Sequence, residues 1–269
     1  MKGVKQICVN IACGNSYADG WLNLDYAPVS PAVIRANLLG RLPLGAASAD
    51  VVYSSHFLEH IPRRRVVGFL AECFRVMKPG GQIRLVLPDM EELCREYLRQ
   101  RGAGAHEKAD FVMLEMLDQC VRTEPGGELG AFYKNLSHGG ANDMVAYAAA
   151  RTGEGLPNAQ SEAPSSDRAT WALLRGRLER LYCRFLTRFL PVAFLEQNVS
   201  FAGVGERHAW IYDFHTLSSL LEQAGFASIQ KMNFNQSEIE SFPLHTLDVT
   251  PAGRPRKGLG SMYVEARKP

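Results

Sequence analysis

The sequence predicts an α/β fold built on a mostly parallel sheet that is interrupted by a helical insertion. Between residue 6 and about residue 88, short apolar runs alternate with longer stretches, which is typical of β-α-β units. The same alternation returns after residue 213, whereas residues 90–207 contain no convincing series of strands. With 269 residues and 46% hydrophobic content, the chain can bury a substantial core.

In the first half, the apolar runs and the residues that interrupt them place each element. We expect a helix over 63–77, where apolar residues recur at helical spacing, and its end at the Lys-Pro-Gly-Gly run of 78–81. The strands are expected at 6–11, 21–24, 49–54 and 82–87. The carboxyl ends of these strands carry polar residues, which is where an open parallel sheet places its ligand.

In the last part, Asp213 is expected to cap a helix that buries Leu217 and Leu221 and ends at Gly225. Strands follow at 227–232 and 262–266. Because the connection between them, 235–260, is long and polar, we expect this pair to be antiparallel at the end of the sheet.

The segment between these halves is predicted to be a helical lid over the substrate. Helices are expected near 90–101, 106–122 and 167–190, with a loop rich in Gly, Pro and Ser at 152–166. The chain therefore divides into a cofactor-binding domain, residues 1–89 and 205–269, and an insertion, residues 90–204. Arg180, Arg184 and Arg188 recur every four residues, which fits either a solvated helix face or a surface that attracts a phosphorylated substrate or an anionic membrane.

Composition excludes several classes of function. Thirty basic and 28 acidic residues give a net charge of only +2, so we expect no nucleic-acid partner held by phosphate neutralisation. The six cysteines form no Cys-x-x-Cys pair, which indicates neither a zinc site nor a disulfide framework and fits a cytoplasmic protein. We therefore expect no metal. We also expect no export signal, because the N-terminus lacks a long apolar region followed by a small-residue cleavage site, and no stable membrane insertion, because no run of about 18 apolar residues occurs. No feature indicates an oligomeric state.

The first strand leads into a turn suited to a ribose-bearing ligand. Ala12, Cys13 and Gly14 are small enough for close backbone approach, and Asp25, at the end of the second strand, can accept hydrogen bonds from ribose hydroxyls. A dinucleotide fingerprint needs a Gly-x-Gly-x-x-Gly turn and an acidic residue about 20 residues later. Here Asp25 follows Gly14 by 11 residues and the glycine triplet is missing, so NAD is disfavoured.

Four motifs in the same order resemble those of a known family. They are VNIACGN with NLD25, ADVVYSSHFLEH60, RVMKPGG81 and LVLPD89, and HAWIYD213 and the terminal YVEAR fit the same pattern. Together they resemble the class I S-adenosylmethionine-dependent methyltransferases, and most closely the bacterial branch of the type 11 group. The resemblance covers roughly residues 1–89 and 205–269.

This resemblance implies a Rossmann-like sheet of seven strands in the order 3-2-1-4-5-7-6, with strand 7 antiparallel, and S-adenosylmethionine as the cofactor, leaving S-adenosylhomocysteine as the product. The positions that it implies for cofactor binding are Asn10, Ala12, Cys13, Gly14, Asp25, Asn37, Leu38, Ser54 and Ser55. Ala12 and Ser16 stand where the family has glycines, and Asn37 stands where an acidic residue often contacts adenine. The short gap before Asp25 implies that the first helix is reduced to a loop.

For the chemistry, the sequence offers four candidate catalytic residues: His56, Asp89, His138 and His208. Methyl transfer from a sulfonium needs alignment of the nucleophile and, for a hydroxyl, removal of its proton, for which histidine is suited near neutral pH. His60 belongs to the Leu-Glu-His run that enters a helix and favours a structural role. The predicted function is O-methylation of a small molecule or glycan precursor, and the alternative is a member of the fold that binds the cofactor or catalyses a rearrangement without methyl transfer.

Overall fold

The fold was analysed in a computed structural model of the chain, which describes residues 6–28, 30–137, 142–153, 178, 181–183, 185–203 and 205–269. Its centre is a seven-stranded sheet in the order β3-β2-β1-β4-β5-β7-β6. The strands are β1 (Cys8–Ile11), β2 (Leu22–Asp25), β3 (Val33–Arg35), β4 (Ala49–Ser55), β5 (Met77–Pro88), β6 (Ala227–Met232) and β7 (Ser261–Arg267).

The predicted strand order is confirmed. Strands β1 to β5 run parallel to one another, and β7 is antiparallel to both of its neighbours, β5 and β6. The central strands are buried on both faces, as Val52 and Tyr53, neighbours in β4 that point to opposite faces, are both covered. Continuous apolar runs of this kind are typical of strands inside a parallel sheet.

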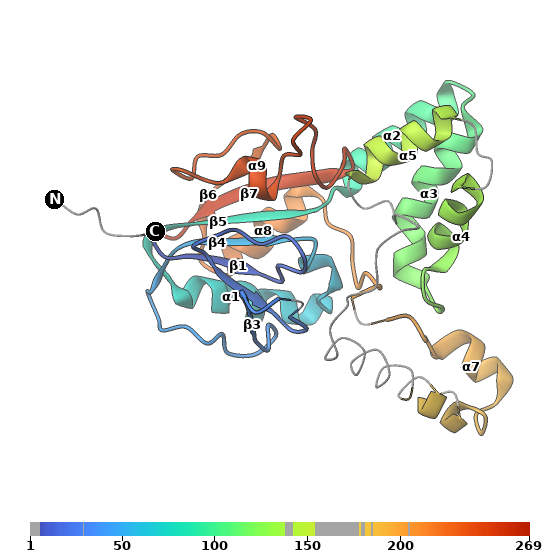
Figure 1. Ribbon diagram of the computed structural model, residues 1–269, viewed down its shortest axis with the longest axis horizontal. Helices are drawn as coiled ribbons and strands as arrows, with labels where there is room; N and C mark the ends of the chain where they lie inside the picture. The colour runs from blue at the N-terminus through green and yellow to red at the C-terminus, as the bar shows by residue number, and fades with distance from the viewer. Residues whose placement is uncertain are drawn as a thin grey trace.

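Helices cover one face of the sheet and project beyond its carboxyl edge (Figure 1). Helices α1 and α8 pack against each other on the same face, and their buried residues join the main apolar core. The helical elements are η1 (Leu58–His60), α1 (Arg63–Val76), α2 (Met90–Gly102), α3 (His106–Val121), α4 (Gly127–Ser137), α5 (Asn142–Thr152), α7 (Val192–Asn198), α8 (Phe214–Gln223) and α9 (Leu244–Leu247). Helix α8 begins as predicted, because the Asp213 carboxylate accepts a hydrogen bond from the N–H of Thr216 at 2.7 Å.

Two predicted boundaries were wrong. Helix α1 ends at Val76, and residues 78–81 belong to β5, which begins at Met77 and not at residue 82. The strand starts early because Met77 pairs with Ala49 ahead of an irregularity, after which Val51 pairs with Gln82. Strand β3 had no predicted range of its own. It is three residues long, and only Val33 in it is buried.

The other face of the sheet is covered by the connection between β6 and β7, which contains α9. Arg84 of β5 is fully buried there and binds two carboxylates. Its Nε donates to Asp248 and its Nη1 donates to Glu265, both at 2.7 Å. This network fixes the 235–260 connection onto the sheet.

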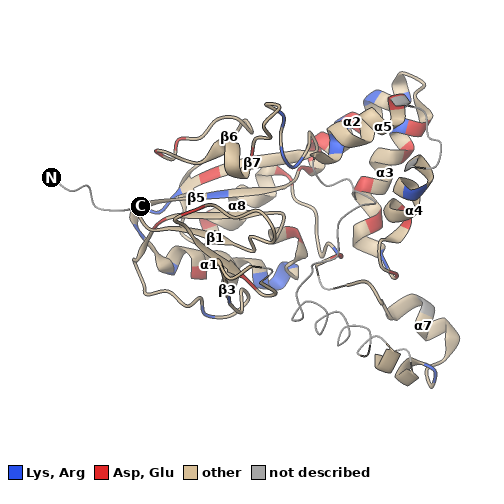
Figure 2. Ribbon diagram, in the orientation of Figure 1, with Lys and Arg blue, Asp and Glu red and all other residues tan. Residues whose placement is uncertain are grey.

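The insertion begins with α2, which continues directly from the carboxyl end of β5, and α2 to α5 lie together beyond that edge (Figure 1). Basic and acidic side chains alternate along these helices without a large region of one sign (Figure 2). Most of the predicted helix over 167–190 and most of the 152–166 loop fall outside the described residues, as do Arg180 and Arg184. The described residues 178, 181–183 and 185–187 of that range are helical. Among the described helices, none combines the length and apolarity needed to cross a membrane.

Candidate functional site

The turn after β1 and the end of β2 meet at the carboxyl edge of the sheet. Ala12 and Gly14 both have positive φ values, 57° and 51°, which bend the chain sharply. The N–H of Gly14 and the N–H of Ala27 each donate to one oxygen of Asp25 at 2.9 Å. A Cβ placed on Gly14 would have nothing within 4 Å, so open space lies over this turn.

This geometry fits one ribose. Each Asp25 oxygen accepts a single backbone hydrogen bond and keeps acceptor capacity for a hydroxyl. The carboxylate is half-buried and is held in position by the loop beside which the ligand would lie. The residues present therefore fit the cofactor that the sequence motifs imply.

Two buried asparagines shape the loop between β1 and β2. The Asn10 amide donates to the carbonyl of Ser16 at 3.0 Å and to Oδ1 of Asn23 at 3.3 Å. Asn23 in turn donates to the carbonyl of Ala18 at 3.1 Å. Asn10 thus supports the loop from inside, and its side chain is fully buried rather than facing a ligand.

The remaining predicted cofactor positions differ in exposure. Asn37 is exposed and its Oδ1 accepts from the N–H of Leu39, while the Leu38 side chain is buried in the core. Ser54 is buried and donates to the carbonyl of Ile11 at 3.0 Å, and Ser55 is half-buried at the end of β4. Leu38 can therefore reach a ligand only through its backbone.

The Cys13 thiol lies in the same turn but is buried and unreactive. Burial raises its pKa to about 11, and the nearby Asp25 carboxylate contributes to the rise. The thiolate is the nucleophilic form, so Cys13 acts here as a small apolar residue.

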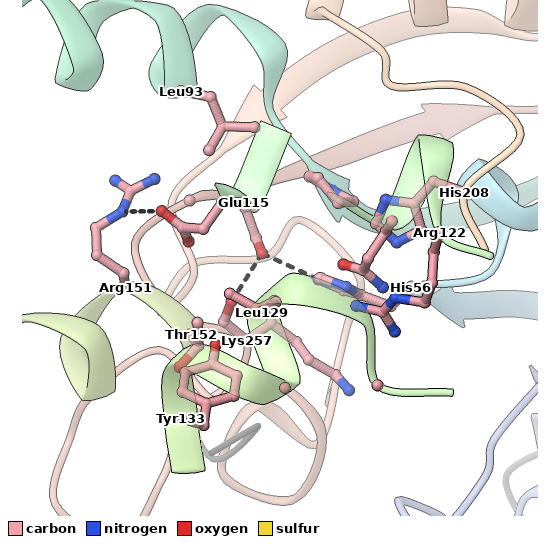
Figure 3. Close-up of a pocket in the computed structure, with 16 residues that line it drawn as sticks. His56, Leu93, Glu115, Arg122, Leu129, Tyr133, Arg151, Thr152, His208 and Lys257 are labelled. Atoms are coloured by element: carbon pink, nitrogen blue, oxygen red, sulfur yellow. Dashed lines mark hydrogen bonds and ion pairs between the residues drawn. The ribbon is translucent and has the colours of Figure 1, made fainter. Parts of the chain in front are cut away.

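A cavity of about 320 Å³ lies between the carboxyl edge of the sheet and the insertion (Figure 3). His56 and Ser261 line it from the sheet side, and Glu115, Tyr133 and Arg151 line it from the insertion. This is the size of a small-molecule pocket. The cavity therefore joins the two predicted parts of the chain.

Glu115 and Arg151 point toward each other across the wall of this cavity (Figure 3). Arg151 Nε donates to Glu115 Oε2 at 3.0 Å, and both side chains are largely buried. Burial raises the pKa of Glu115 to about 7, although the charge of Arg151 opposes this rise. A carboxyl group with that pKa can take up a proton near neutral pH.

Asp89 is already engaged on both oxygens. Its Oδ1 caps α2 by accepting from the N–H of Glu91 at 3.0 Å, and its Oδ2 binds Lys231 Nζ at 2.5 Å. The side chain is 2% exposed. This arrangement positions α2 and the edge of the sheet.

Three histidines converge on one buried carboxylate, Glu59. His56 Nδ1 lies 3.4 Å from Glu59 Oε1, His60 Nε2 lies 3.9 Å from it, and His208 Nε2 lies 4.0 Å from it. The rings of His60 and His208 are 4.8 Å apart, edge to face. His56 and His208, from the predicted set, are thus brought together, whereas His138 lies outside the described residues.

Burial dominates the electrostatics of this cluster. It raises the pKa of Glu59 to about 8 and lowers the pKa of His208 to about 3, and it holds the pKa of His56 well below its usual range. His56 also has a φ of 51°, a left-handed conformation that is unusual for a residue other than glycine, asparagine or aspartate. Such strained positions are frequent at functional sites.

The sequence did not single out Glu59 or Glu115. Glu59 belongs to a Leu-Glu-His run that resembles an ordinary helix entry, and Glu115 lies on a helix whose apolar pattern gives no sign of a pocket. The spacing of His56, Glu59 and His60 is the one signal that could have indicated a cluster.

Two comparisons with known proteins both find similarity to methyltransferases. Residues 10–85 match the family model of a methyltransferase domain, type 11. Over 77 residues the chain is 35% identical to a protein of Mycolicibacterium smegmatis with the name probable S-adenosylmethionine-dependent methyltransferase. This alignment covers 25% of the chain and 29% of that relative.

Solved structures with a similar fold share little sequence. A SAM-dependent methyltransferase from Archaeoglobus fulgidus is 13% identical, with 98% of this chain and 86% of that chain covered and a TM-score of 0.42. A possible histamine N-methyltransferase from Thermotoga maritima is 12% identical, with 99% and 83% covered and a TM-score of 0.39. Because these TM-scores are low, the fold assignment depends on the strand order itself.

Proposed function

We propose that this chain, which carries a class I S-adenosylmethionine-dependent methyltransferase domain, transfers the cofactor's methyl group to an oxygen of a small molecule or glycan precursor. The observation that carries the proposal is the pairing of Asp25 with the Gly14 turn at the sheet edge. One acidic residue, one open turn and no glycine triplet suit a ligand with a single ribose and no pyrophosphate.

When bound, S-adenosylmethionine supplies a methyl group on a sulfonium, which is already activated for transfer. The protein then has to align the acceptor oxygen with that methyl group. Asp25 would hold the ribose hydroxyls, and the backbone of Ala12 to Gly14 would lie along the methionine part. The ends of β4 and β5 would set the direction from which the acceptor approaches.

In the transfer step, the acceptor oxygen forms a bond to the methyl carbon while the carbon–sulfur bond breaks. The electron pair of that bond stays on sulfur, which becomes a neutral thioether. The hydroxyl proton needs an acceptor, and Glu115 lines the cavity with a pKa of about 7. We assign it the role of general base, in preference to Asp89, both of whose oxygens are occupied.

The helical insertion supports a small acceptor. The cavity of about 320 Å³ has one wall on the insertion, so residues 90–204 would cover the substrate, while residues 1–89 and 205–269 hold the cofactor. The lining combines the carboxyl group of Glu115 with Arg122, Arg151 and the hydroxyl group of Tyr133. This polarity suits an acceptor with several hydroxyl groups.

The test is transfer of a labelled methyl group. The full chain is incubated with methyl-labelled S-adenosylmethionine and a set of sugar, phenol and amine acceptors, and both the labelled product and S-adenosylhomocysteine are quantified. Label on an oxygen, lost in Asp25→Ala, supports the proposal. Binding of S-adenosylhomocysteine with no transfer to any acceptor would favour a protein that uses the cleft without methylating.

A further inference from the structure

Glu59 is a buried acidic residue without the partners that such a group requires. Its side chain is 0% exposed, and neither carboxylate oxygen accepts a hydrogen bond from the part of the chain that the structure describes. An ionised carboxylate is strongly unfavourable in a protein interior unless hydrogen bonds or an opposite charge compensate for the water that it loses. The charge of Lys257, in the wall of the same cavity, favours the ionised form of Glu59 but does not outweigh its burial. A proton or a further cation must therefore accompany the carboxylate.

The hydrogen bonds of His56 fix the position of its ring proton. Ser261 Oγ donates its hydrogen to the carbonyl of Lys257 at 2.8 Å, so it can only accept from His56 Nε2, 3.0 Å away. The proton of a neutral His56 is then on Nε2. Its Nδ1 lone pair points at Glu59, 3.4 Å away.

His60 shows the same arrangement from the other side. Its Nδ1 lies 2.7 Å from the carbonyl of Arg207, which is an acceptor only, so the ring donates from Nδ1. The lone pair of its Nε2 then also faces Glu59, 3.9 Å away. Histidines that bind a metal usually donate their other ring N–H to a carbonyl or a carboxylate in this way.

We infer that Glu59, His60 and His208 form a binding site for a divalent transition-metal ion, with His56 placed to complete it. One ligand atom from each of the three residues lies within 4.8 Å of the other two. Ligands at about 2.1 Å from a tetrahedral ion lie about 3.4 Å apart, so small side-chain movements would close the site. Imidazole nitrogen and carboxylate oxygen together favour ions of the Zn²⁺, Co²⁺ and Mn²⁺ type over Mg²⁺ and Ca²⁺.

The site lies at the wall of the substrate cavity, because His56 and His208 both line that cavity. An ion there would face the acceptor and lower the pKa of a hydroxyl group bound to it. Such an ion would explain why a buried carboxylate follows directly from the end of β4. The ion's role in catalysis depends on the proposed methyl transfer, whereas its binding does not.

The inference reverses the expectation of no metal. That expectation assumed neither a Cys-x-x-Cys pair nor a His-x-x-x-His pair, but His56 and His60 have the second spacing. The competing explanation is a neutral Glu59 whose proton is shared with His56 Nδ1, and it requires no ion. The metal site predicts that one ion binds per chain, whereas a neutral Glu59 predicts no such binding. This difference can be measured without knowing the substrate.

The experiment is a titration of the full, chelator-treated chain with Co²⁺, followed by visible absorption and by isothermal calorimetry with Zn²⁺. We expect one ion per chain and the d–d bands of a low-symmetry site. His208→Ala and Glu59→Gln should each weaken binding by at least about tenfold. This figure is cautious, because losing a group that only hydrogen-bonds a metal ligand already weakens binding by about that much. His215→Ala removes an exposed histidine outside the cluster and should bind as the unaltered chain does.

Near-ultraviolet circular dichroism establishes that each variant is folded, and His208→Ala suffices if Glu59→Gln does not fold. Equal affinity in His208→Ala and His215→Ala, or no stoichiometric binding by the unaltered chain, would overturn the inference. The same preparation is titrated with S-adenosylhomocysteine. Cofactor binding without metal binding rejects the metal site alone, and metal binding without cofactor binding rejects the proposed function alone.

Discussion

Replacing Arg84 by methionine should destabilise the protein strongly while keeping the side chain's length. Arg84 is fully buried and donates to Asp248 and Glu265, each at 2.7 Å, and to the carbonyl of Gln236 at 3.0 Å. Methionine would leave two carboxylates buried without their cation. Asp248 would keep only the hydroxyl of Tyr53, at 2.6 Å.

The expected magnitude follows from these contacts. Removing one partner of a buried ion pair costs about 3–5 kcal/mol. Arg84 serves two carboxylates, which places the loss near the upper end of that range. For a chain of this size, a loss of about 4–5 kcal/mol corresponds to roughly 7–9 °C in melting temperature.

Urea unfolding at pH 7, followed by circular dichroism, measures the loss of unfolding free energy. The slope of that free energy against urea concentration checks that unfolding stays cooperative. The matched control is Arg95→Met, because Arg95 and its partner Glu91 are 72% and 45% exposed, and the urea midpoint of this variant should hardly change. The loss of unfolding free energy in Arg84→Met should become smaller as the pH falls, because protonation neutralises the two carboxylates that have lost their cation. A loss below about 1 kcal/mol would refute this reasoning, because the range for broken buried pairs begins well above it.

Two further predictions concern the junction between the sheet and the insertion. Gly258→Ala should cost at least about 2 kcal/mol in thermal unfolding, because the new Cβ would lie 1.9 Å from the carbonyl oxygen of Arg151. Gly253→Ala is its control, since that glycine has the same φ of 71° but open space around it, and equal losses would contradict the argument. For Glu115, the folded-state pKa of about 7 lies above the unfolded value of 4.5, so the native state binds the extra proton between these values. Its contribution to stability is therefore complete below pH 4.5 and is lost as the pH rises to 7, by up to about 1.4 kcal/mol per unit. Glu115→Gln should remove this decline in a series of urea midpoints, and an unchanged slope would show that Glu115 ionises normally.

Much of the fold could be predicted because most of its strands are apolar runs with polar ends. Strands β1, β4 and β7 repeat the predicted segments within two residues. Strand β3 escaped prediction because a three-residue strand with one buried side chain has no periodicity to detect. The start of β5 was missed because Pro79 and Gly80 indicate a turn, while the tertiary pairing of Met77 with Ala49 draws them into the strand.

The contact between the Gly14 turn and Asp25, which we propose for the cofactor, could be anticipated from the sequence because the two residues are only 11 positions apart. The histidine cluster was not, because His208 reaches Glu59 only through the fold. Glu115 could not be recognised either, since its pKa depends on burial against Arg151. Local chemistry can be predicted from spacing, whereas contacts between distant segments require the structure.

The most direct test of the central claim is a calorimetric titration of the chain with S-adenosylhomocysteine. The account predicts one binding site, no binding of NAD, and a loss of about 100-fold in Asp25→Ala, as expected for removing the hydrogen bonds that two hydroxyls donate to a charged carboxylate. Asp19→Ala changes an exposed acidic residue nearby and should bind normally. Absence of binding by the folded, unaltered chain, or equal affinity in Asp25→Ala, would contradict the account.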